Sequence, residues 1–312
     1  MKKTFLGSGM LLLAAFFWGS TFVAQSSAAE RISPFCYLFA RSVVGALALF
    51  FVILLRLLLQ KKKRGLTIKG LFSRRTLLGG VLCGVALTAG SALQQYGIHL
   101  GASAGQAGFL TALYMFFVPL FAFLFYKKRP SVSLLAGAVL TAVGLYFLCL
   151  KGDGGALFGI GQLLLIGCAL VFALHILLVD RYEKSDGMAL SCVQFSTCAL
   201  LSLPVALLFE SGSFLHIPEA PFPILYAGIC SSAIAYTLQI YGQKYTPPAL
   251  ASVLVSTESV IALLSEWACA ALGIFGTAFA LSVDQCVGCV LAFLGILCAQ
   301  SLFSFKKKKK TS

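Results

Sequence analysis

The sequence predicts an all-α integral membrane protein whose ten transmembrane helices form two inverted five-helix repeats around a central cavity. Three observations support this prediction: ten long apolar segments, a one-sided distribution of basic residues, and an internal repeat. Of the 312 residues, 59% are hydrophobic and 11% are charged, and the mean hydropathy is +0.95. A soluble domain of this length cannot bury that much apolar surface.

Each apolar segment is close to the length of about 20 residues with which a helix crosses the hydrocarbon core while satisfying its own backbone hydrogen bonds. In the first half, the predicted helices cover Phe5–Ala24, Pro34–Leu55, Thr76–Gly97, Ala102–Tyr126 and Val132–Leu150. Lys2 and Lys3 precede the first segment, a basic stretch from Arg56 to Arg75 follows the second, and Lys127 follows the fourth. These charges mark helix ends because Lys and Arg are excluded from hydrocarbon.

The second half has the same organisation. Its predicted helices cover Leu157–Val179, Gly187–Phe209, Pro221–Gln243, Pro248–Leu272 and Val283–Phe305. Arg181 and Lys184 follow the sixth segment, Lys244 follows the eighth, and a polybasic tail, Lys306–Lys310, follows the tenth.

Threading the ten segments alternately through a bilayer tests their number. It leaves 21 of the 24 Lys and Arg residues on one side, Arg31 and Lys151 on the other, and Arg41 within the second helix. The positive-inside rule then places both termini in the cytoplasm, with the chain in the plasma membrane. The net charge of +14 indicates this topology and contact with anionic lipid head groups, not nucleic-acid binding, which needs a folded basic face with aromatic platforms.

The amino terminus has a second interpretation. Lys2, Lys3, the apolar run and the small residues Ala24 to Ala29 also resemble a signal peptide, whose cleavage would leave nine helices. We favour retention because the first segment carries Trp18 and Thr21 and has a counterpart in the second half.

The internal repeat is the second strong signal. Two motif pairs recur about 150 residues apart: 93–97 (LQQYG) with 238–242 (LQIYG), and Gly137-x6-Gly144 with Gly288-x6-Gly295. The halves, residues 1–150 and 151–312, therefore contain five helices each. Because five is odd, the halves are inverted relative to each other, which is the architecture of many secondary transporters that work by alternating access. The alternative is a gene duplication in a protein without transport activity.

Several segments resemble motifs of a known family. They are Trp18-Gly19-Ser20-Thr21-Phe22-Val23 with Pro34 and Arg41, Ala107-Gly108-Phe109-Leu110-Thr111 with Tyr114 and Pro119, and Ser256-Thr257-Glu258-Ser259-Val260. Across almost all of residues 4–305, the chain resembles the drug/metabolite transporter (DMT) superfamily, and its EamA-type transporters in particular. The resemblance implies a cavity lined mainly by helices one, three, four, six, eight and nine, and a small organic solute, amino-acid-like or drug-like, that is often moved outward.

The chain departs from the family pattern at three places. Ser259 stands where proline is usual, Phe172 where tryptophan is common, and Gly273-Ile274 where a Gly-Glu pair often ends helix nine. The missing carboxylate puts in doubt any charge role at that last position.

Polar residues within the apolar segments predict the cavity lining, because a polar side chain that faces lipid costs free energy. The candidate substrate-binding or cavity residues are Trp18, Thr21, Gln25, Gln94, Tyr96, Tyr114, His175, Gln239, Tyr241, Ser256 and Glu258. Packing is the alternative for Trp18 and the interpretation we favour for His175. Hydrogen bonding between helices is the alternative for the glutamines and serines.

Three charges stand out well inside the predicted helices, Arg41, Glu258 and Glu266. Glu258 lies near the midplane, where we expect a carboxylate that handles the solute or a coupled proton; the alternative is a protonated carboxyl bonded to a neighbouring helix throughout. Arg41 and Glu266 each lie about 10 Å from the outer helix end, a depth that allows a gating or structural ion pair. Tyr114 holds the place in the first half that Glu258 holds in the second.

The sequence carries no motif for an enzyme or for ATP-driven pumping: it has no Walker lysine, His-Glu-x-x-His or Gly-x-Ser-x-Gly. We therefore predict no cofactor and no catalytic residue. Cys286-x-x-Cys289 opens a membrane helix without a second pair or a His cluster, so no metal site is predicted either. Two alternatives remain, an intramembrane enzyme that uses Glu258 and His175, and a scaffold or sensor.

Overall fold

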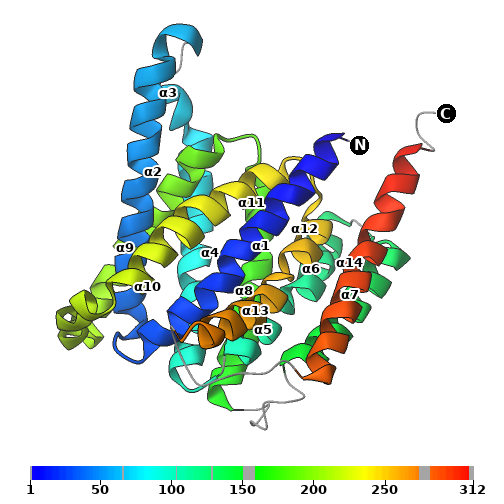
Figure 1. Cartoon of the computed structure of the whole chain (residues 1–312). Coiled ribbons are helices and arrows are strands. Elements are labelled where there is room, and N and C mark those ends of the chain that lie inside the picture. Colours follow the sequence, from blue (N-terminus) through cyan, green and yellow to red (C-terminus); the bar gives the residue numbers. More distant parts are fainter. Residues whose placement is uncertain are drawn as a thin grey trace.

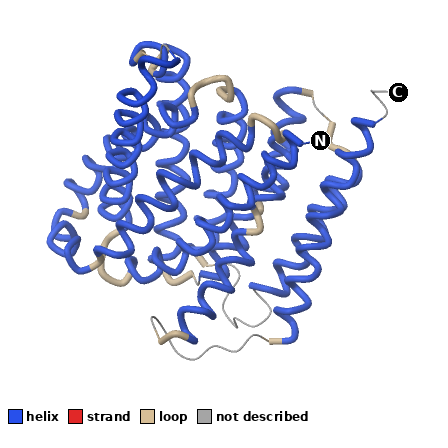
Figure 2. The backbone as a smooth tube through the Cα atoms, turned by 45° about the horizontal axis from the view of Figure 1, so that its top comes forward, coloured by secondary structure: helices blue, strands red, loops and turns tan. Residues whose placement is uncertain are grey.

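The computed structural model describes residues 2–64, 67–102, 104–127, 129–149, 159–273 and 282–308. Within these ranges every regular element is a helix (Figure 2). The first half contains α1 (Lys2–Ala29), α2 (Pro34–Arg64), α3 (Ile68–Leu71), α4 (Arg74–His99), α5 (Ala104–Ala112), α6 (Tyr114–Tyr126) and α7 (Val132–Cys149). The second half contains α8 (Ile160–Arg181), α9 (Gly187–Phe209), the 3-10 helix η1 (Ser211–Glu219), α10 (Pro221–Tyr226), the π-helix η2 (Ala227–Ala235), α11 (Tyr236–Gln243), α12 (Pro248–Val255), α13 (Glu258–Ala271) and α14 (Val283–Lys308).

These helices correspond to the ten predicted segments. Among the described residues, eight spans have the length and composition to cross a membrane, and two shorter apolar helices, Val132–Phe147 and Val283–Ala299, supply the fifth and tenth segments. The ten-helix fold is thus confirmed. Leu150, Leu157, Ile274 and the predicted boundary between residues 150 and 151 lie outside the described residues, as do Lys151 and the last two lysines of the tail.

Two helices extend past their predicted ends. α1 continues from Ala24 to Ala29, and α2 continues from Leu55 to Arg64. Gln, Ala, Lys and Arg have helix propensities close to the best, so a helix can continue into the polar region once its apolar part ends. Hydropathy predicts where the hydrocarbon ends and not where the helix ends.

The predictions of continuous fourth and ninth helices are wrong at one place each. The fourth segment is interrupted at Leu113, between α5 and α6, and the ninth at Ser256 and Thr257, between α12 and α13. At both places amides bond three residues back: Leu113 N–H donates to the Leu110 carbonyl, and Thr257 N–H donates to that of Leu254. Such 3-10 turns tighten a helix and change its direction.

The distribution of polarity differs from that in a soluble protein, because the outside of the bundle is apolar. Large apolar side chains such as Leu47, Phe51 and Phe293 are exposed on the outside of the bundle, where lipid tails solvate them. Hydroxyls, amides and the charged Arg41 and Glu258 are buried inside it. Buried polar groups therefore lie among the more numerous apolar side chains of the interior.

The two halves are inverted, as predicted, because equivalent helices pack antiparallel. In α2 and α9, Cys36 contacts Glu210, Ala46 contacts Cys192, and Arg56 contacts Asp186. In α7 and α14, the pattern is the same: a Cβ built on Gly137 would meet the backbone of Gly295 and Ala299, and one on Gly144 would meet that of Gly288 and Ala292. Other contacts come in symmetric pairs, since α2 packs on η2 as α9 packs on α4.

The α2–α9 pair and the α7–α14 pair stand at opposite edges of the bundle (Figure 1). The beginning of α1, the end of α2 with α3, and the end of α14 all lie at the top of that view. Because the start of α1 with Lys2 and Lys3, the last turns of α2 with Arg56, and α3 with Lys69 belong to this side, we call it the basic face, and the opposite end of the bundle the far face.

Substitution of Gly144 by Val is expected to destabilise the α7–α14 pair. Gly144 lies against the backbone of α14, so close that even a Cβ would approach the Gly288 carbonyl oxygen to 2.7 Å. Forcing atoms into such a contact typically costs about 1–3 kcal/mol, and we expect a lower Tm of the purified protein in detergent. Val143→Leu is the matched control because Val143 is exposed on the lipid side. Equal melting of both variants would contradict close packing at Gly144.

Candidate functional site

A cavity lies between the two halves of the bundle. Its wall combines charged, amide and aromatic side chains from helices of both repeats. The lining residues are Trp18, Phe22, Gln25, Arg41, Gln94, Tyr114, Phe172, His175, Ile176, Ser231, Tyr236, Gln239, Val255 and Glu258. Seven of the candidate cavity residues are among them, together with Arg41.

Glu258 and Tyr114 occupy the two interrupted helices. Tyr114 is the first residue of α6 and Glu258 is the first residue of α13, so both directly follow a break. The Tyr114 hydroxyl donates a hydrogen bond to Glu258 Oε1 at 2.8 Å, and both side chains are at least 95% buried. The equivalence predicted from the repeat thus becomes a direct contact across the pseudo-twofold axis.

Hydroxyl groups explain the break in the ninth helix. Ser252, Ser256 and Thr257 each donate to the carbonyl oxygen three residues earlier, at 2.9, 2.8 and 2.7 Å. Such bonds compete with the helical backbone bonds and bend a helix. In the fourth segment, Pro119 lies one to two turns after the break and lacks the N–H that would bond to the preceding turn.

Arg41 lies in the cavity wall and is 4% exposed. Its Nη2 donates to Ser91 Oγ at 3.1 Å, and its guanidinium carbon lies 5.7 Å from the centre of the Tyr37 ring. Within the described part of the chain, Arg41 Nε has no hydrogen-bond partner. Glu266 is exposed on α13, so the suggested Arg41–Glu266 pair stays a prediction.

Aromatic rings form one side of the cavity. The centre of the Tyr236 ring lies 4.7 Å from that of Trp18 and 5.7 Å from that of His175, both edge to face. His175 Nε2 is 3.3 Å from Gln194 Oε1, which fixes the imidazole. The Trp18 indole N–H is buried and finds no acceptor among the described residues.

The two repeated glutamines line the cavity from opposite halves. Gln94 Nε2 donates to Thr111 Oγ1 at 3.2 Å, whereas Gln239 Oε1 is buried and meets no donor in the ranges that the structure describes. Buried polar atoms are nearly always satisfied, and one in a cavity wall can bond to water or to a ligand there. The wall thus offers two unused donors, Trp18 Nε1 and Arg41 Nε, and one unused acceptor.

Four candidate residues are not among those that line the cavity. Thr21 donates to the Phe17 carbonyl at 2.6 Å, and Ser256 bonds to its own helix as described above. Tyr96 and Tyr241 lie at the ends of α4 and α11, on opposite faces of the bundle. Helical spacing places polar groups on a face, but it does not distinguish a group that points into a cavity from one that bonds to its own backbone.

Sequence reasoning missed four lining residues with polar or aromatic side chains: Phe22, Phe172, Ser231 and Tyr236. The signal that could have found three of them is helical spacing from candidates already chosen, because residues three or four apart share a face. Phe22 lies four residues after Trp18, and Phe172 and Tyr236 lie three before His175 and Gln239. No such signal identifies Ser231, which lies in the π-helical segment η2.

No group of three or more His, Cys, Asp or Glu side chains that could hold a metal ion occurs among the described residues.

Comparison with known proteins shows similarity to one transporter family along almost the whole chain. The model of the EamA-like transporter family matches residues 5–150 and 159–300. An uncharacterized transporter of Archaeoglobus fulgidus is 30% identical over 265 residues, covering 85% of this chain and 78% of that protein. The uncharacterized transporter YwfM of Bacillus subtilis is 26% identical over 307 residues, covering 97% and 95%.

A solved crystal structure has a TM-score of 0.74 with 19% sequence identity, and the match covers 95% of this chain and 97% of that one. At this identity the likeness concerns the fold alone.

Proposed function

The chain belongs to the EamA-like transporter family, and on that premise we propose that it is a secondary transporter that carries a small organic metabolite across the plasma membrane by alternating access. The solute is amino-acid-like or drug-like and moves outward, the direction that is common in the family. Both termini lie in the cytoplasm, because the basic face then meets the anionic inner leaflet.

The observation that carries this proposal is the unused hydrogen-bonding capacity of the cavity wall. Among the described residues, Trp18 Nε1 and Arg41 Nε are donors without an acceptor, and Gln239 Oε1 is an acceptor without a donor. Arg41 and Glu258 supply opposite charges, and rings from α1, α8 and α11 supply apolar surface. A solute with an acidic group, a donor and an apolar body matches these features.

Glu258 is the candidate for proton coupling. It is a buried carboxyl at membrane depth that is bonded to the other repeat through Tyr114. An ionisable group in that position usually marks a solute or proton pathway. Protonation of Glu258 would change its bond with Tyr114, and with it the contact between the two broken helices.

An intramembrane enzyme is the second candidate, and a scaffold or sensor is the third. For the enzyme, Glu258 and His175 line the same cavity and offer an acid–base pair. Both side chains are bonded within the protein, Glu258 to Tyr114 and His175 to Gln194. These bonds favour a role in holding the cavity wall over a role in catalytic turnover.

The proposal is tested in two steps. Metabolite profiles of cells that lack or overproduce the protein are compared with profiles of their medium, which identifies the solute and its direction together. That solute is then assayed by counterflow in vesicles that contain the purified protein. We expect uptake of labelled solute against unlabelled solute without chemical change. Turnover in detergent, where no gradient exists, would favour the enzyme, and no movement of any differing metabolite would favour the scaffold or sensor.

A further inference from the structure

The repeated motif ends in a tyrosine in both halves, and the two tyrosines lie at opposite ends of the bundle. Tyr96 is near the end of α4 at the far face, and Tyr241 is near the end of α11 at the basic face. Neither lines the central cavity. Each one contacts residues at the ends of α2 and α9, the antiparallel pair at one edge of the bundle.

At the far face, one carboxylate joins three helices. The Tyr96 hydroxyl donates to Glu210 Oε1 at 2.7 Å, and the backbone N–H of Cys36 donates to Glu210 Oε2 at 2.9 Å. Glu210 follows the last residue of α9, and Cys36 is in the first turn of α2. The Tyr96 ring also packs edge to face on Phe35, with ring centres 5.8 Å apart. We call Tyr96, Glu210 and the first turn of α2 the far-face latch.

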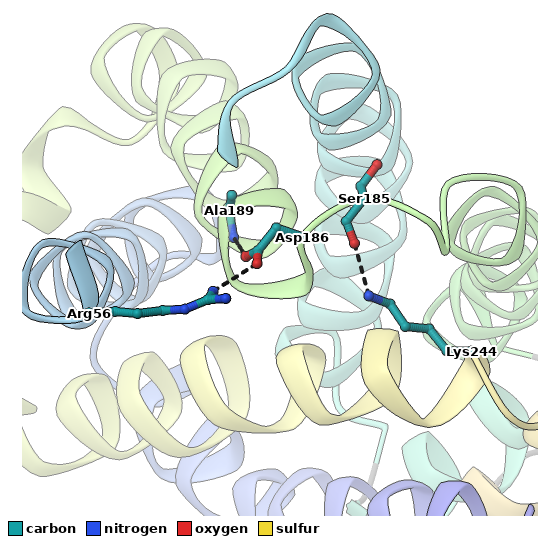
Figure 3. A network of polar contacts seen from close by, with 5 residues as sticks. All are labelled: Arg56, Ser185, Asp186, Ala189 and Lys244. Carbon is teal, nitrogen blue, oxygen red and sulfur yellow. Dashed lines mark hydrogen bonds and ion pairs between the residues drawn. The ribbon is translucent and has the colours of Figure 1, made fainter. Parts of the chain in front are cut away.

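At the basic face, a second carboxylate, that of Asp186, also joins α2 to α9, but it precedes α9 (Figure 3). Arg56 Nη1 from α2 donates to Asp186 Oδ2 at 2.7 Å, and the backbone N–H of Ala189 donates to Asp186 Oδ1 at 3.1 Å. Asp186 therefore caps α9 and forms an ion pair with the same carboxylate. The two side chains are only 23% and 16% exposed, so water screens the pair less than it screens a surface pair.

Tyr241 and Lys244 complete this contact from α11 and the turn that follows it. The Tyr241 ring lies against the first residue of α9, since a Cβ built on Gly187 would be 2.9 Å from the ring. Lys244 Nζ lies 4.9 Å from the centre of that ring and donates to the Ser185 carbonyl at 2.9 Å (Figure 3). Burial lowers the pKa of Lys244, against the opposing effect of nearby carboxylates. We call Arg56, Asp186, Tyr241 and Lys244 with its Ser185 contact the basic-face latch.

The tyrosines and the helix starts of the two latches correspond under exchange of the halves, whereas both carboxylates lie at ends of α9. At the far face, Tyr96 meets the start of α2 and the end of α9. At the basic face, Tyr241 meets the start of α9 beside Arg56 from α2. At the far face, Glu210 follows α9 and caps the start of α2. At the basic face, Asp186 precedes α9 and caps α9 itself. The two latches differ in charge, because only the basic-face latch contains an ion pair.

We propose that the two latches are the gates of the cavity: each holds one hairpin, α4–α5 at the far face or α11–α12 at the basic face, against the α2–α9 pair. Each hairpin ends at a helix break, α5 at Leu113 and α12 at Ser256, and a 3-10 interruption of this kind is a frequent hinge. Release of a latch lets its hairpin turn about its hinge and opens the cavity to that face. The consequence for transport rests on the proposed function, whereas the gating motion itself does not.

Two variants each remove one bond of a single latch and keep the rest of the side chain's packing. Lys244→Met keeps most of the side-chain stem and removes the ammonium that donates to the Ser185 carbonyl, the bond that ties the end of α11 to the start of α9. Tyr96→Phe keeps the ring on Phe35 and removes the hydroxyl that bonds to Glu210. Tyr245→Phe is the control, because Tyr245 is in the turn after α11 and is 40% exposed.

The readout is hydrogen–deuterium exchange of the full-length protein in lipid nanodiscs without added solute. A hydrogen bond to a charged group contributes enough to shift an opening equilibrium about tenfold or more. We expect Lys244→Met to raise exchange about tenfold in residues 237–255 and not in 94–113. Tyr96→Phe should raise it by a similar factor in 94–113 and not in 237–255, and Tyr245→Phe should change neither.

Unchanged exchange in both variants, or an equal rise in both hairpins in either one, would overturn the latches, because a gate must act on its own face. Exchange is measured without solute, so a failed transport assay leaves this result standing. Conversely, normal counterflow together with unchanged exchange would remove the latches and leave the proposed function in place.

Discussion

Replacement of Glu258 by Gln is expected to lower the rate of solute transport about thirtyfold or more. Gln has nearly the same volume and keeps an oxygen that can accept the Tyr114 hydroxyl bond, which is 2.8 Å long in the structure. It removes the charge, and a hydrogen bond to a charged group contributes about 1.5–3 kcal/mol. At 1.36 kcal/mol per factor of ten, a loss of about 2 kcal/mol is close to thirtyfold. Counterflow in vesicles measures the rate.

The same variant also tests whether transport is coupled to protons through Glu258. If Glu258 carries the coupled proton, Glu258→Gln also abolishes the response of transport to an imposed pH gradient. Tyr114→Phe, which removes only the hydroxyl, should lower the rate less and keep the response. Glu219→Gln is the matched control, because Glu219 is exposed in η1 at the far face. Transport by Glu258→Gln at the normal rate, with its pH response intact, would refute the role of this carboxyl.

Substitution of Gly19 by Val is expected to remove most of the folded protein. A Cβ on Gly19 would collide with the Glu258 carbonyl oxygen and would lie 2.5 Å from Ile261 Cβ. Both belong to α13, and the first of them is backbone that cannot move away without shifting the helix break. Overpacking of this kind costs about 1–3 kcal/mol and sometimes more, and Val adds two further methyl groups.

The matched control for Gly19 is on the same helix. No atom lies within 4 Å of a Cβ built on Gly9, so Gly9→Ala should leave the Tm unchanged or raise it slightly, because Ala favours a helix by about 0.5–1 kcal/mol over Gly. Monodispersity and thermal melting in detergent measure both variants. A Gly19→Val protein that melts with the native protein would show that α1 and α13 are further apart than in the structure.

The fold was predictable because the membrane is a solvent of known thickness. It sets the length of the apolar segments and the side on which the basic residues lie. Ten apolar segments, their order and their inversion could all be inferred without coordinates. The breaks at Leu113 and Ser256 could not, since they depend on bonds that single hydroxyls make to nearby carbonyls and on one proline two turns away. Hydropathy averaged over a segment does not report such local hydrogen bonds.

For the cavity, the sequence indicated which residues are polar at membrane depth but not where each one points. Glu258, Tyr114 and the glutamines at 94 and 239 line the cavity, whereas Thr21 bonds to its own helix. Tyr96 and Tyr241 were chosen for the right reason, their repetition, but lie at the helix ends. Their equivalence in the repeat indicated a shared task and left its location open.

The antiparallel packing of each self-equivalent pair, α2 with α9 and α7 with α14, has a consequence for the history of the chain. If the chain arose by joining two copies of a five-helix unit, two oppositely oriented copies would already make these contacts, and joining them would let equivalent positions diverge. The tyrosine at 114 and the glutamate at 258 hold equivalent positions and now bond to each other, a pairing that two identical copies could not have made.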